Sequence, residues 1–380
     1  MILGIDASNI RGGGGVTHLV EMLGAGEPKE YGFDKVFIWG GSPTLDKIEA
    51  RSWLVKIYEP LLDRSLFHRF FWSRFLLSKR MKESKSDILF VPGGSYSGSF
   101  RPFVTMSQNL LPFEWSEIRR YGFSISALRL ILLFFSQSFT FRKAKGVIFL
   151  TNYAKKIVLK KVKISLDRVA IVNHGINQKF FHAVKIQKDI GEYSNEKPYR
   201  ILYVSFIGEY KHQWNVVRAV SNLKKQGFPV TLDLVGSPDD PLAVKKLKDV
   251  LDQEDAERLF IRYHSLIPYS EIEKKYIEAD LFAFASSCET FGQIVTEAMA
   301  AGLPIACSNL SAMPEILQDA GKYFDPLNVD SIEETIKSMI NSKETRKEVS
   351  EKAFQLAKSF SWKKAANETF EFLQKATVTK

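Results

Sequence analysis

The chain has 380 residues, which exceeds one typical domain and favours two domains of about 180 residues each. Hydrophobic residues make up 45% and charged residues 25%, a composition that lets each domain build a core. Two cysteines, Cys288 and Cys307, exclude a disulfide framework and lack metal-ligand spacing, which fits a reducing cytosol.

Charge is distributed unevenly along the chain. Residues 1–180 hold 27 Lys+Arg against 14 Asp+Glu, a net charge of +13, and the remainder has a net charge of −3. This asymmetry suggests that the first half meets something anionic. No charged region followed by a long apolar one opens the sequence, and the longest mostly apolar uncharged stretch, 130–141, is too short to span a bilayer. We therefore expect a cytoplasmic protein.

Strands and helices alternate through both halves. The first half begins with a strand at 2–6, four glycines at 12–15 and a helix at 16–23. Further strands are predicted in this half at 36–39, 88–91, 104–106 and 147–150, and in the second half at 200–206, 230–235, 259–262, 281–285 and 305–307. This alternation predicts two doubly wound α/β domains, 1–182 and 199–360. The polar segment 183–198 lacks an apolar period and is the predicted linker, and Ser361 is a plausible N-cap for a last helix at 363–376.

The most informative segment is 281–308, which holds two carboxylates with seven residues between them. Glu289 falls in the loop after a buried strand, and Glu297 falls about one turn inside a helix that should begin near Gly292 and end at Gly302. A helix N-terminus beside the end of a strand offers N–H groups and partial positive charge to an anionic ligand. On spacing alone, an ordinary strand–helix–strand unit with surface glutamates is about equally plausible.

The whole string, from Glu289 through Phe291-Gly292 to Pro304, with Pro314-Glu315 further on, resembles the E-x7-E signature of retaining glycosyltransferases of family 4 (glycosyl transferases group 1). The resemblance implies the GT-B fold, in which two Rossmann-like domains face each other across a cleft. It also implies that the second domain binds a nucleotide-sugar, that the first binds the acceptor, and that the final helix crosses back onto the first domain.

The resemblance assigns roles within the second half of the chain. Glu289 would contact the sugar hydroxyls and stabilise a developing oxocarbenium ion, and Glu297 would accept hydrogen bonds from the nucleotide ribose. Lys211 would hold the donor phosphates, although a lone loop lysine is most often only solvated. The family's arginine upstream of this lysine is absent, because Ser205 and Phe206 occupy that region. The backbone near Phe291, Gly292, Gln293 and Ile294 would complete the donor pocket, and Ile267 would lie in the loop that abuts the base.

Candidates in the first half depend more on the resemblance. Gly13 and Gly14 belong to a loop that is either a ligand cradle facing the donor diphosphate or simply flexible; the E-x7-E match favours the cradle. Gln108 stands where the family commonly has histidine; it can hydrogen-bond a sugar but is no acid or base. Asn109 and His174 are further possible contacts to acceptor or sugar, and structural roles for these residues are about equally plausible.

No D-x-D motif is present and the six histidines have no metal-like spacing. We expect neither a metal nor a cofactor, the nucleotide-sugar being a substrate. Lys211 and a helix dipole would supply the positive charge instead.

The segment 61–82 is basic and apolar. Leu66, Phe67, Phe70, Phe71 and Leu77 cluster on one side of a helical wheel. Such a helix either lies on an anionic membrane or packs on its own domain with a solvated basic edge, and the two interpretations are about equally plausible.

These observations favour a hexosyltransferase that moves a hexose from a UDP- or GDP-sugar to a glycan or lipid-linked acceptor in cell-envelope polysaccharide synthesis, peripheral to the inner face of the plasma membrane. One alternative is a non-catalytic basic module that binds membrane or nucleic acid, although no nucleic-acid motif is visible. Another is a sugar-nucleotide epimerase of the same architecture.

Overall fold

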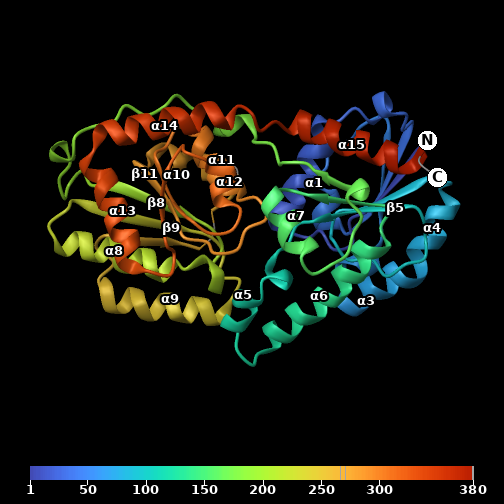
Figure 1. Cartoon of the computed structure of the whole chain (residues 1–380), viewed down its shortest axis with the longest axis horizontal. Helices are drawn as coiled ribbons and strands as arrows, with labels where there is room; N and C mark the ends of the chain where they lie inside the picture. The colour runs from blue at the N-terminus through green and yellow to red at the C-terminus, as the bar shows by residue number, and fades with distance from the viewer. Residues whose placement is uncertain (266, 270, 379–380) are drawn as a thin grey trace. The chain divides into compact units, whose positions relative to one another are not determined.

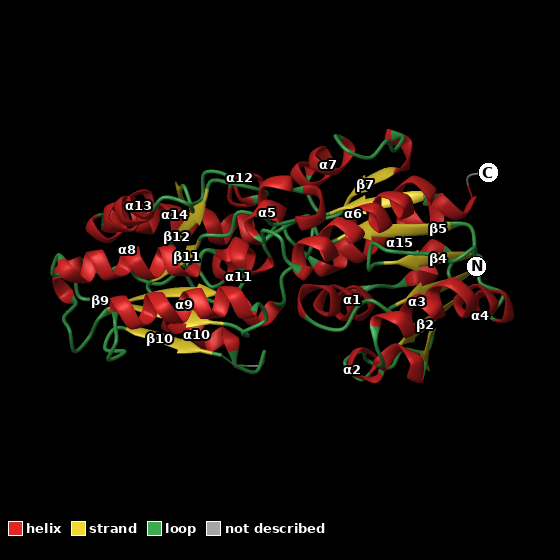
Figure 2. Ribbon diagram, turned by 90° about the horizontal axis from the view of Figure 1, so that it is seen from below, coloured by secondary structure: helices red, strands yellow, loops and turns green. Residues whose placement is uncertain are grey.

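The computed structural model describes residues 1–265, 267–269 and 271–378, and divides them into two units. The first unit is Met1–Gly175 with Phe360–Lys380, and the second is Ile176–Ser359. Each unit is a parallel sheet with helices on both sides (Figure 2). This confirms the prediction of two doubly wound Rossmann-like domains.

The first unit has a seven-stranded sheet of order β3-β2-β1-β4-β5-β6-β7, in which every pair is parallel. Its strands are β1 Ile2–Asp6, β2 Lys35–Gly40, β3 Leu54–Tyr58, β4 Ile88–Val91, β5 Phe103–Ser107, β6 Gly146–Phe149 and β7 Val169–Ile171. Its helices are α1 Gly13–Ala25, α2 Ser42–Leu45, α3 Leu66–Phe71, α4 Leu77–Glu83, α5 Trp115–Arg120, α6 Ile125–Lys143, α7 Asn152–Leu159 and α15 Trp362–Val378. A π-helical turn, η3 Trp72–Leu76, joins α3 to α4, and short 3-10 turns are η1 Pro28–Tyr31, η2 Pro60–Asp63, η4 Leu111–Phe113 and η5 Leu166–Arg168.

The second unit has a six-stranded parallel sheet of order β10-β9-β8-β11-β12-β13. Its strands are β8 Tyr199–Val204, β9 Val230–Val235, β10 Ile261–His264, β11 Leu281–Phe284, β12 Ile305–Ser308 and β13 Lys322–Phe324. Its helices are α8 Gln213–Lys225, α9 Pro241–Glu254, α10 Ile272–Glu278, α11 Gln293–Ala300, α12 Met313–Leu317, α13 Val329–Asn341 and α14 Lys343–Ala357, with 3-10 turns η6 Gln178–Phe180, η7 Ile190–Glu192 and η8 Glu209–Lys211.

Three strands escaped the sequence prediction: β3, β7 and β13. All three are edge strands and all are partly exposed. An edge strand needs no continuous apolar run, since only part of it is covered. The central strands β1, β4, β8, β9 and β11 are almost entirely buried, and their apolar runs predicted them to within two residues.

The polar segment 183–198 is not a linker, because the chain passes from one unit to the other at Gly175–Ile176. The segment packs within the second unit through polar contacts. Lys185 Nζ lies 2.9 Å from Asp280 Oδ1, and Gln187 Oε1 accepts a hydrogen bond of 3.1 Å from the buried Arg346. Its lack of apolar period therefore marks a segment held by side-chain hydrogen bonds.

The last helix, α15, belongs to the first unit, where it packs on α1 and on strands β4, β5 and β6 (Figure 1). The ring of Phe372 on α15 explains why residue 146 of β6 is a glycine. A Cβ at Gly146 would lie 2.6 Å from the Phe372 ring, so only glycine lets the helix approach the strand this closely.

The predicted amphipathic helix at 61–82 is interrupted, and its apolar residues divide between two environments. The extra residue of the π turn η3 rotates the following helix relative to α3. As a result, Leu77 is buried, whereas Leu66, Phe67, Phe70 and Phe71 are exposed. The single apolar side predicted by the helical wheel is therefore wrong.

By length and composition, one helix of the described chain, α6, could cross a membrane. In the structure one side of it lies against the first unit, where Leu130, Gln137, Thr140 and Phe141 are buried.

Candidate functional site

The second unit gathers its polar candidates where the strand order reverses. Strands β8 and β11 are neighbours at this point, and the chain leaves them in opposite directions along the sheet. Open parallel sheets bind ligands at the carboxyl ends of strands at such a switch point. Lys211 lies in the loop after β8, and Glu289 lies in the loop after β11.

Lys211 and Glu289 form an ion pair between these two loops. The family resemblance implies separate roles for these two residues, and the structure brings them into direct contact. Lys211 is only 3% exposed, and its Nζ lies 5.1, 4.8 and 5.3 Å from the ring centres of Phe206, Tyr210 and Phe284. Aromatic faces attract an ammonium group, so the rings and Glu289 together hold the lysine charge in place.

The two loops are also joined through their backbones. Ser287 N–H donates to Tyr210 O over 2.8 Å, and His212 Nε2 lies 2.9 Å from Ser287 Oγ. Glu289 N–H donates to Ser311 Oγ over 2.6 Å, and that hydroxyl donates to Glu289 O over 2.8 Å. These contacts fix the carboxylate of Glu289 relative to Lys211.

Phe206 stands in the region where the family would place a second cation. Instead of a guanidinium, it brings an aromatic ring to 5.1 Å from the Lys211 ammonium. Its backbone O accepts a hydrogen bond of 2.8 Å from Gln213 Nε2, which secures the loop.

Helix α11 begins beside this pair. Its N-cap, Gly292, has a φ of 86°, a left-handed conformation that favours glycine. Phe291 is 2% exposed and belongs to the core, whereas Gln293 and Ile294 are half-buried. Phe291 therefore supports this corner through packing, and its side chain offers almost no surface to a ligand.

Glu297 lies on the same helix in a separate, buried environment. It is 4% exposed, and it accepts hydrogen bonds from Tyr276 Oη over 3.1 Å and Tyr269 Oη over 3.4 Å. Burial raises the pKa of Glu297 to about 7, against the lowering effects of these hydrogen bonds and of Lys179. Lys179 Nζ lies 3.5 Å from the ring centre of Tyr269.

Sequence reasoning missed Tyr269, Tyr276 and Lys179, which surround Glu297. Tyrosine and lysine at unremarkable spacings carry no signal by themselves; the tertiary fold alone brings them to the glutamate. Ile267 is half-buried in the loop after β10, and its neighbour Leu266 lies outside the described residues.

The first unit holds its candidates at the ends of β1 and β5. Gly13 has a φ of 60°, and a Cβ at Gly12, Gly13 or Gly14 would meet no described atom within 4 Å. A Cβ at Gly15 would lie 3.2 Å from Gln108 Oε1. Helix α1 begins at Gly13 and not at residue 16 as predicted, so these glycines form its N-cap and first turn, with Gln108 beside them.

The remaining two candidates of this unit have structural contacts. Asn109 Oδ1 accepts a hydrogen bond of 3.1 Å from Leu111 N–H, which closes a turn. His174 is buried, and its ring lies 4.8 Å from His18 and 5.4 Å from Trp362 of the last helix. His174 thus packs between His18 and the last helix, and its contact with a sugar stays a prediction.

Within residues 1–265, 267–269 and 271–378, no three His, Cys, Asp or Glu side chains gather as potential metal ligands. Both cysteines are buried thiols.

With this geometry established, comparison with known structures defines the class of fold. Sucrose-phosphate synthase of Thermosynechococcus elongatus has a TM-score of 0.77 at 14% identity, covering 97% of both chains. Anabaena HepE in complex with UDP and glucose has a TM-score of 0.70 at 16% identity, covering 98% of this chain and 99% of the other. The chain has the GT-B fold of these proteins.

The sequence of the second unit is similar to a known family. Residues 185–356 match the family model described as glycosyl transferases group 1. O-antigen chain mannosyltransferase B of Escherichia coli is 34% identical over 110 residues, which cover 29% of each chain. Sulfoquinovosyl transferase SQD2 of Arabidopsis thaliana is 25% identical over a region that covers 38% of this chain and 31% of SQD2. The matched region therefore spans less than a third of the length of each of these two relatives.

Proposed function

We propose that this protein is a retaining hexosyltransferase, which moves a hexose from a nucleoside-diphosphate sugar to an acceptor hydroxyl. The observation that carries the proposal is the Lys211–Glu289 ion pair at the switch point of the family-matched unit, beside the N-terminus of α11. A buried ammonium and a helix N-terminus are complementary to a diphosphate. Relatives named as mannosyltransferases and a structural neighbour bound to UDP support a UDP- or GDP-sugar as donor.

In the proposed reaction, Lys211 exchanges its anionic partner Glu289 for the donor diphosphate. Without donor, Glu289 neutralises Lys211 inside an aromatic surrounding. When a donor binds, its diphosphate takes over Lys211, and the Glu289 carboxylate becomes available to the sugar hydroxyls and to the positive charge that develops at the anomeric carbon. Lys211 then stabilises the leaving nucleoside diphosphate.

The bond changes balance without a covalent enzyme intermediate. The bond between the anomeric carbon and the donor phosphate oxygen breaks, and the acceptor oxygen attacks from the same face. The acceptor proton passes to the departing phosphate oxygen. Positive charge comes from Lys211 and the α11 N-terminus, and we propose that neither a metal nor a cofactor is required.

Glu297 would bind the nucleotide ribose, and its tyrosine partners would hold its orientation until the diol arrives. We further propose that a glycan or lipid-linked acceptor binds the first unit near Gln108, and that Gly13 and Gly14 contact the donor diphosphate. The role would be cell-envelope polysaccharide synthesis at the inner face of the plasma membrane, in keeping with the relative named for O-antigen chains.

The test is a panel of radiolabelled UDP- and GDP-sugars incubated with the protein and a membrane extract. Transfer of label to extract material by the wild type, unaffected by EDTA, is the expected result, and NMR of the product should show the anomeric configuration of the donor. Turnover of the nucleotide-sugar without any acceptor would identify an epimerase. Stabilisation by oligonucleotides but not by UDP or GDP would identify a binding module.

A further inference from the structure

The first unit carries an exposed apolar surface on two neighbouring helical segments. On α6, five apolar residues are exposed at spacings of three and four, so they form one stripe: Ile125, Leu128, Leu132, Phe135 and Phe139. On α3 and η3, five more are exposed: Leu66 at 57%, Phe67 at 72%, Phe70 at 55%, Phe71 at 41% and Phe75 at 57%. Contiguous exposed apolar side chains on this scale indicate an interaction surface.

The two segments cover the same face of the sheet. Met81 of α4 lies where a Cβ of Gly4 would point, and parallel register puts Gly4, Leu89 and Phe103 on that face. Phe141 of α6 packs on Phe149, which the register places on the same face. The Phe372 ring of α15 lies on the opposite face, because it approaches Gly146.

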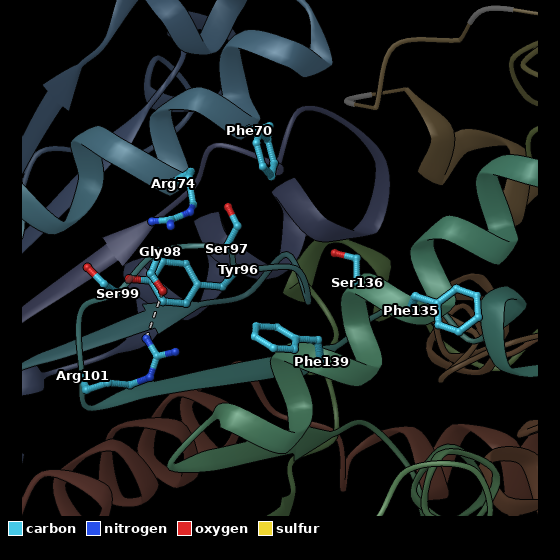
Figure 3. A pocket seen from close by; sticks show the side chains of 10 residues that line it. All are labelled: Phe70, Arg74, Tyr96, Ser97, Gly98, Ser99, Arg101, Phe135, Ser136 and Phe139. Carbon is cyan, nitrogen blue, oxygen red and sulfur yellow. Dashed lines mark hydrogen bonds between the residues drawn. The ribbon is translucent and has the colours of Figure 1, made fainter.

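The connection from β4 to β5, residues 92–102, contains no helix, whereas most connections in such a fold are helical. This segment, together with α3, η3 and α6, lines a cavity of about 480 Å³ (Figure 3). That volume falls in the range of ligand sites.

The cavity has a fixed polar floor. Tyr96 N–H donates to Thr140 Oγ1 of α6 over 2.9 Å, and Ser99 N–H donates to Ser78 Oγ of α4 over 3.1 Å. Ser97 N–H donates to Ser73 Oγ of η3 over 3.3 Å. The connection is therefore tied to the helices on both sides, and the cavity is built into the unit.

Two arginines line this cavity, Arg74 from η3 and Arg101 from the floor (Figure 3). The Arg101 guanidinium lies 4.5 Å from the ring centre of Phe103 and donates to Phe100 O over 2.6 Å, which holds it beside the cavity. Among the described residues, the arginines of the first unit that form ion pairs are Arg51, Arg80 and Arg120, and neither Arg74 nor Arg101 is one of them. Within the described part of the chain, the cavity thus contains two positive charges without an ion-pair partner.

The surroundings are basic as well. Residues 118–166 contain eleven Lys and Arg and not one Asp or Glu, and residues 64–82 also lack acidic side chains. Burial, followed by the charges of Arg11 and Arg129, lowers the pKa of Arg69 on α3, which places three guanidinium groups near one another. A second copy of this chain would bring like charges together across a symmetric interface, whereas an anionic lipid surface complements them.

We propose that the face formed by α3, η3 and α6 docks on an anionic phospholipid membrane, with one lipid phosphate held in the cavity between Arg74 and Arg101. The exposed phenylalanines enter the interfacial layer, where aromatic and aliphatic side chains of amphipathic helices are stable. Guanidinium groups bind phosphate through paired hydrogen bonds, and apolar rings beside them suit the adjoining glycerol and acyl carbons. This inference rests on the proposed function, because membrane docking would bring the first unit, which is proposed to bind the acceptor, to acceptors in the membrane.

The test is flotation of the full-length protein with vesicles, without any nucleotide-sugar. We expect the wild type to float with mixed phosphatidylcholine–phosphatidylglycerol vesicles and not with phosphatidylcholine alone, and to be released by high salt. Arg74→Gln/Arg101→Gln should lower binding roughly 30-fold, which corresponds to about 2 kcal/mol. Phe70→Ser/Phe135→Ser should lower it at least as much.

The matched control is Lys160→Gln/Lys163→Gln, which removes two exposed charges of the same unit outside the cavity. If the control lost as much vesicle binding as the arginine double variant, the phosphate site would be wrong, and binding would come from the overall positive charge of the unit. Absence of vesicle binding by the wild type would overturn membrane docking altogether. Docking would also be overturned if light scattering showed that the wild type is a dimer and that the Phe70→Ser/Phe135→Ser variant is a monomer. Thermal shifts by UDP and GDP report on the second unit, so the donor hypothesis stands or fails separately.

Discussion

The two units share one strand order over their first six strands and differ in what they place at the switch point. In the second unit, loops after β8 and β11 bring together a buried ammonium and a carboxylate. In the first unit, the four glycines that follow the loop after β1 form the N-cap and first turn of α1, and a Cβ at Gly12, Gly13 or Gly14 would meet no described atom within 4 Å. The same strand order thus supports a site of fixed charges in one unit and an open glycine-rich helix N-terminus in the other, which shows that local sequence, and not sheet topology, decides the chemistry.

The largest expected effect breaks the charged site. Lys211→Ala and Glu289→Ala should each reduce transfer by roughly 10²–10³-fold or more, because each removes a group proposed to stabilise charge in the transition state. Initial rates with saturating donor would check this. Transfer at the wild-type rate by either variant would contradict the site assignment.

The same pair predicts a stability effect that an exposed pair would not give. Removing one partner leaves a buried charge unpaired, so Lys211→Met and Glu289→Gln should each lower the free energy of unfolding by about 3–5 kcal/mol. The double variant Lys211→Met/Glu289→Gln should recover much of this loss. Urea unfolding of all four proteins would measure the coupling, and strict additivity would show that the pair is not coupled.

Glu297 gives opposite effects on binding and on stability. Its folded pKa of about 7 exceeds the ordinary value of 4.5, so between these pH values the unfolded chain has released a proton that the folded chain retains. Stability from this group is therefore fully present below pH 4.5 and is lost as the pH rises to 7. Glu297→Gln should unfold at a higher temperature than the wild type at pH 8, while binding UDP or GDP roughly tenfold more weakly. A matched decrease in both properties would show that Glu297 is only structural.

Gly13 and Gly14 test the first unit in the same way as Lys211 and Glu289 test the second. Gly14→Ala adds a Cβ that meets no described atom within 4 Å, so the melting temperature should stay within a few degrees of the wild type. If the loop cradles a ligand, transfer should fall roughly tenfold or more through lost close approach. Wild-type kinetics from this variant would indicate a loop that is merely flexible. Gly13→Ala is the companion, and its φ of 60° should add roughly 1 kcal/mol of strain.

The smallest effect concerns the first unit's histidine pair. Burial, followed by the charge of His174, lowers the pKa of His18 well below its ordinary value of 6.5. Below pH 6.5 the unfolded chain binds a proton that the folded chain does not. The free energy of unfolding therefore decreases as the pH is lowered, by at most about 1.4 kcal/mol per pH unit. His18→Phe should unfold with a weaker dependence on pH between 6.5 and 5. An unchanged slope would assign the acid sensitivity to other groups.

The sequence located the site better than it described it. Glu289, Lys211 and Gly292 were found from their motif and from strand endings, and the structure places them together. Their direct contact was not predictable, because the two loops are 78 residues apart in sequence and meet only when β8 pairs with β11. The surroundings of Glu297 were missed for the same reason, since Tyr269 and Tyr276 reach it only through the packing of α10 and its preceding loop.

The sequence alone determined the class of fold, the ends of the buried strands and the region of the charged site. Apolar runs, glycines and proline carry that information locally, because they report the burial and backbone conformation of their own segment. Only the tertiary structure decided which polar groups contact one another. It also decided that the edge strands exist, that residues 183–198 pack within the second unit, and that Leu77 is buried while Phe70 is exposed. Those outcomes depend on partners that are distant in the chain, which no local pattern records.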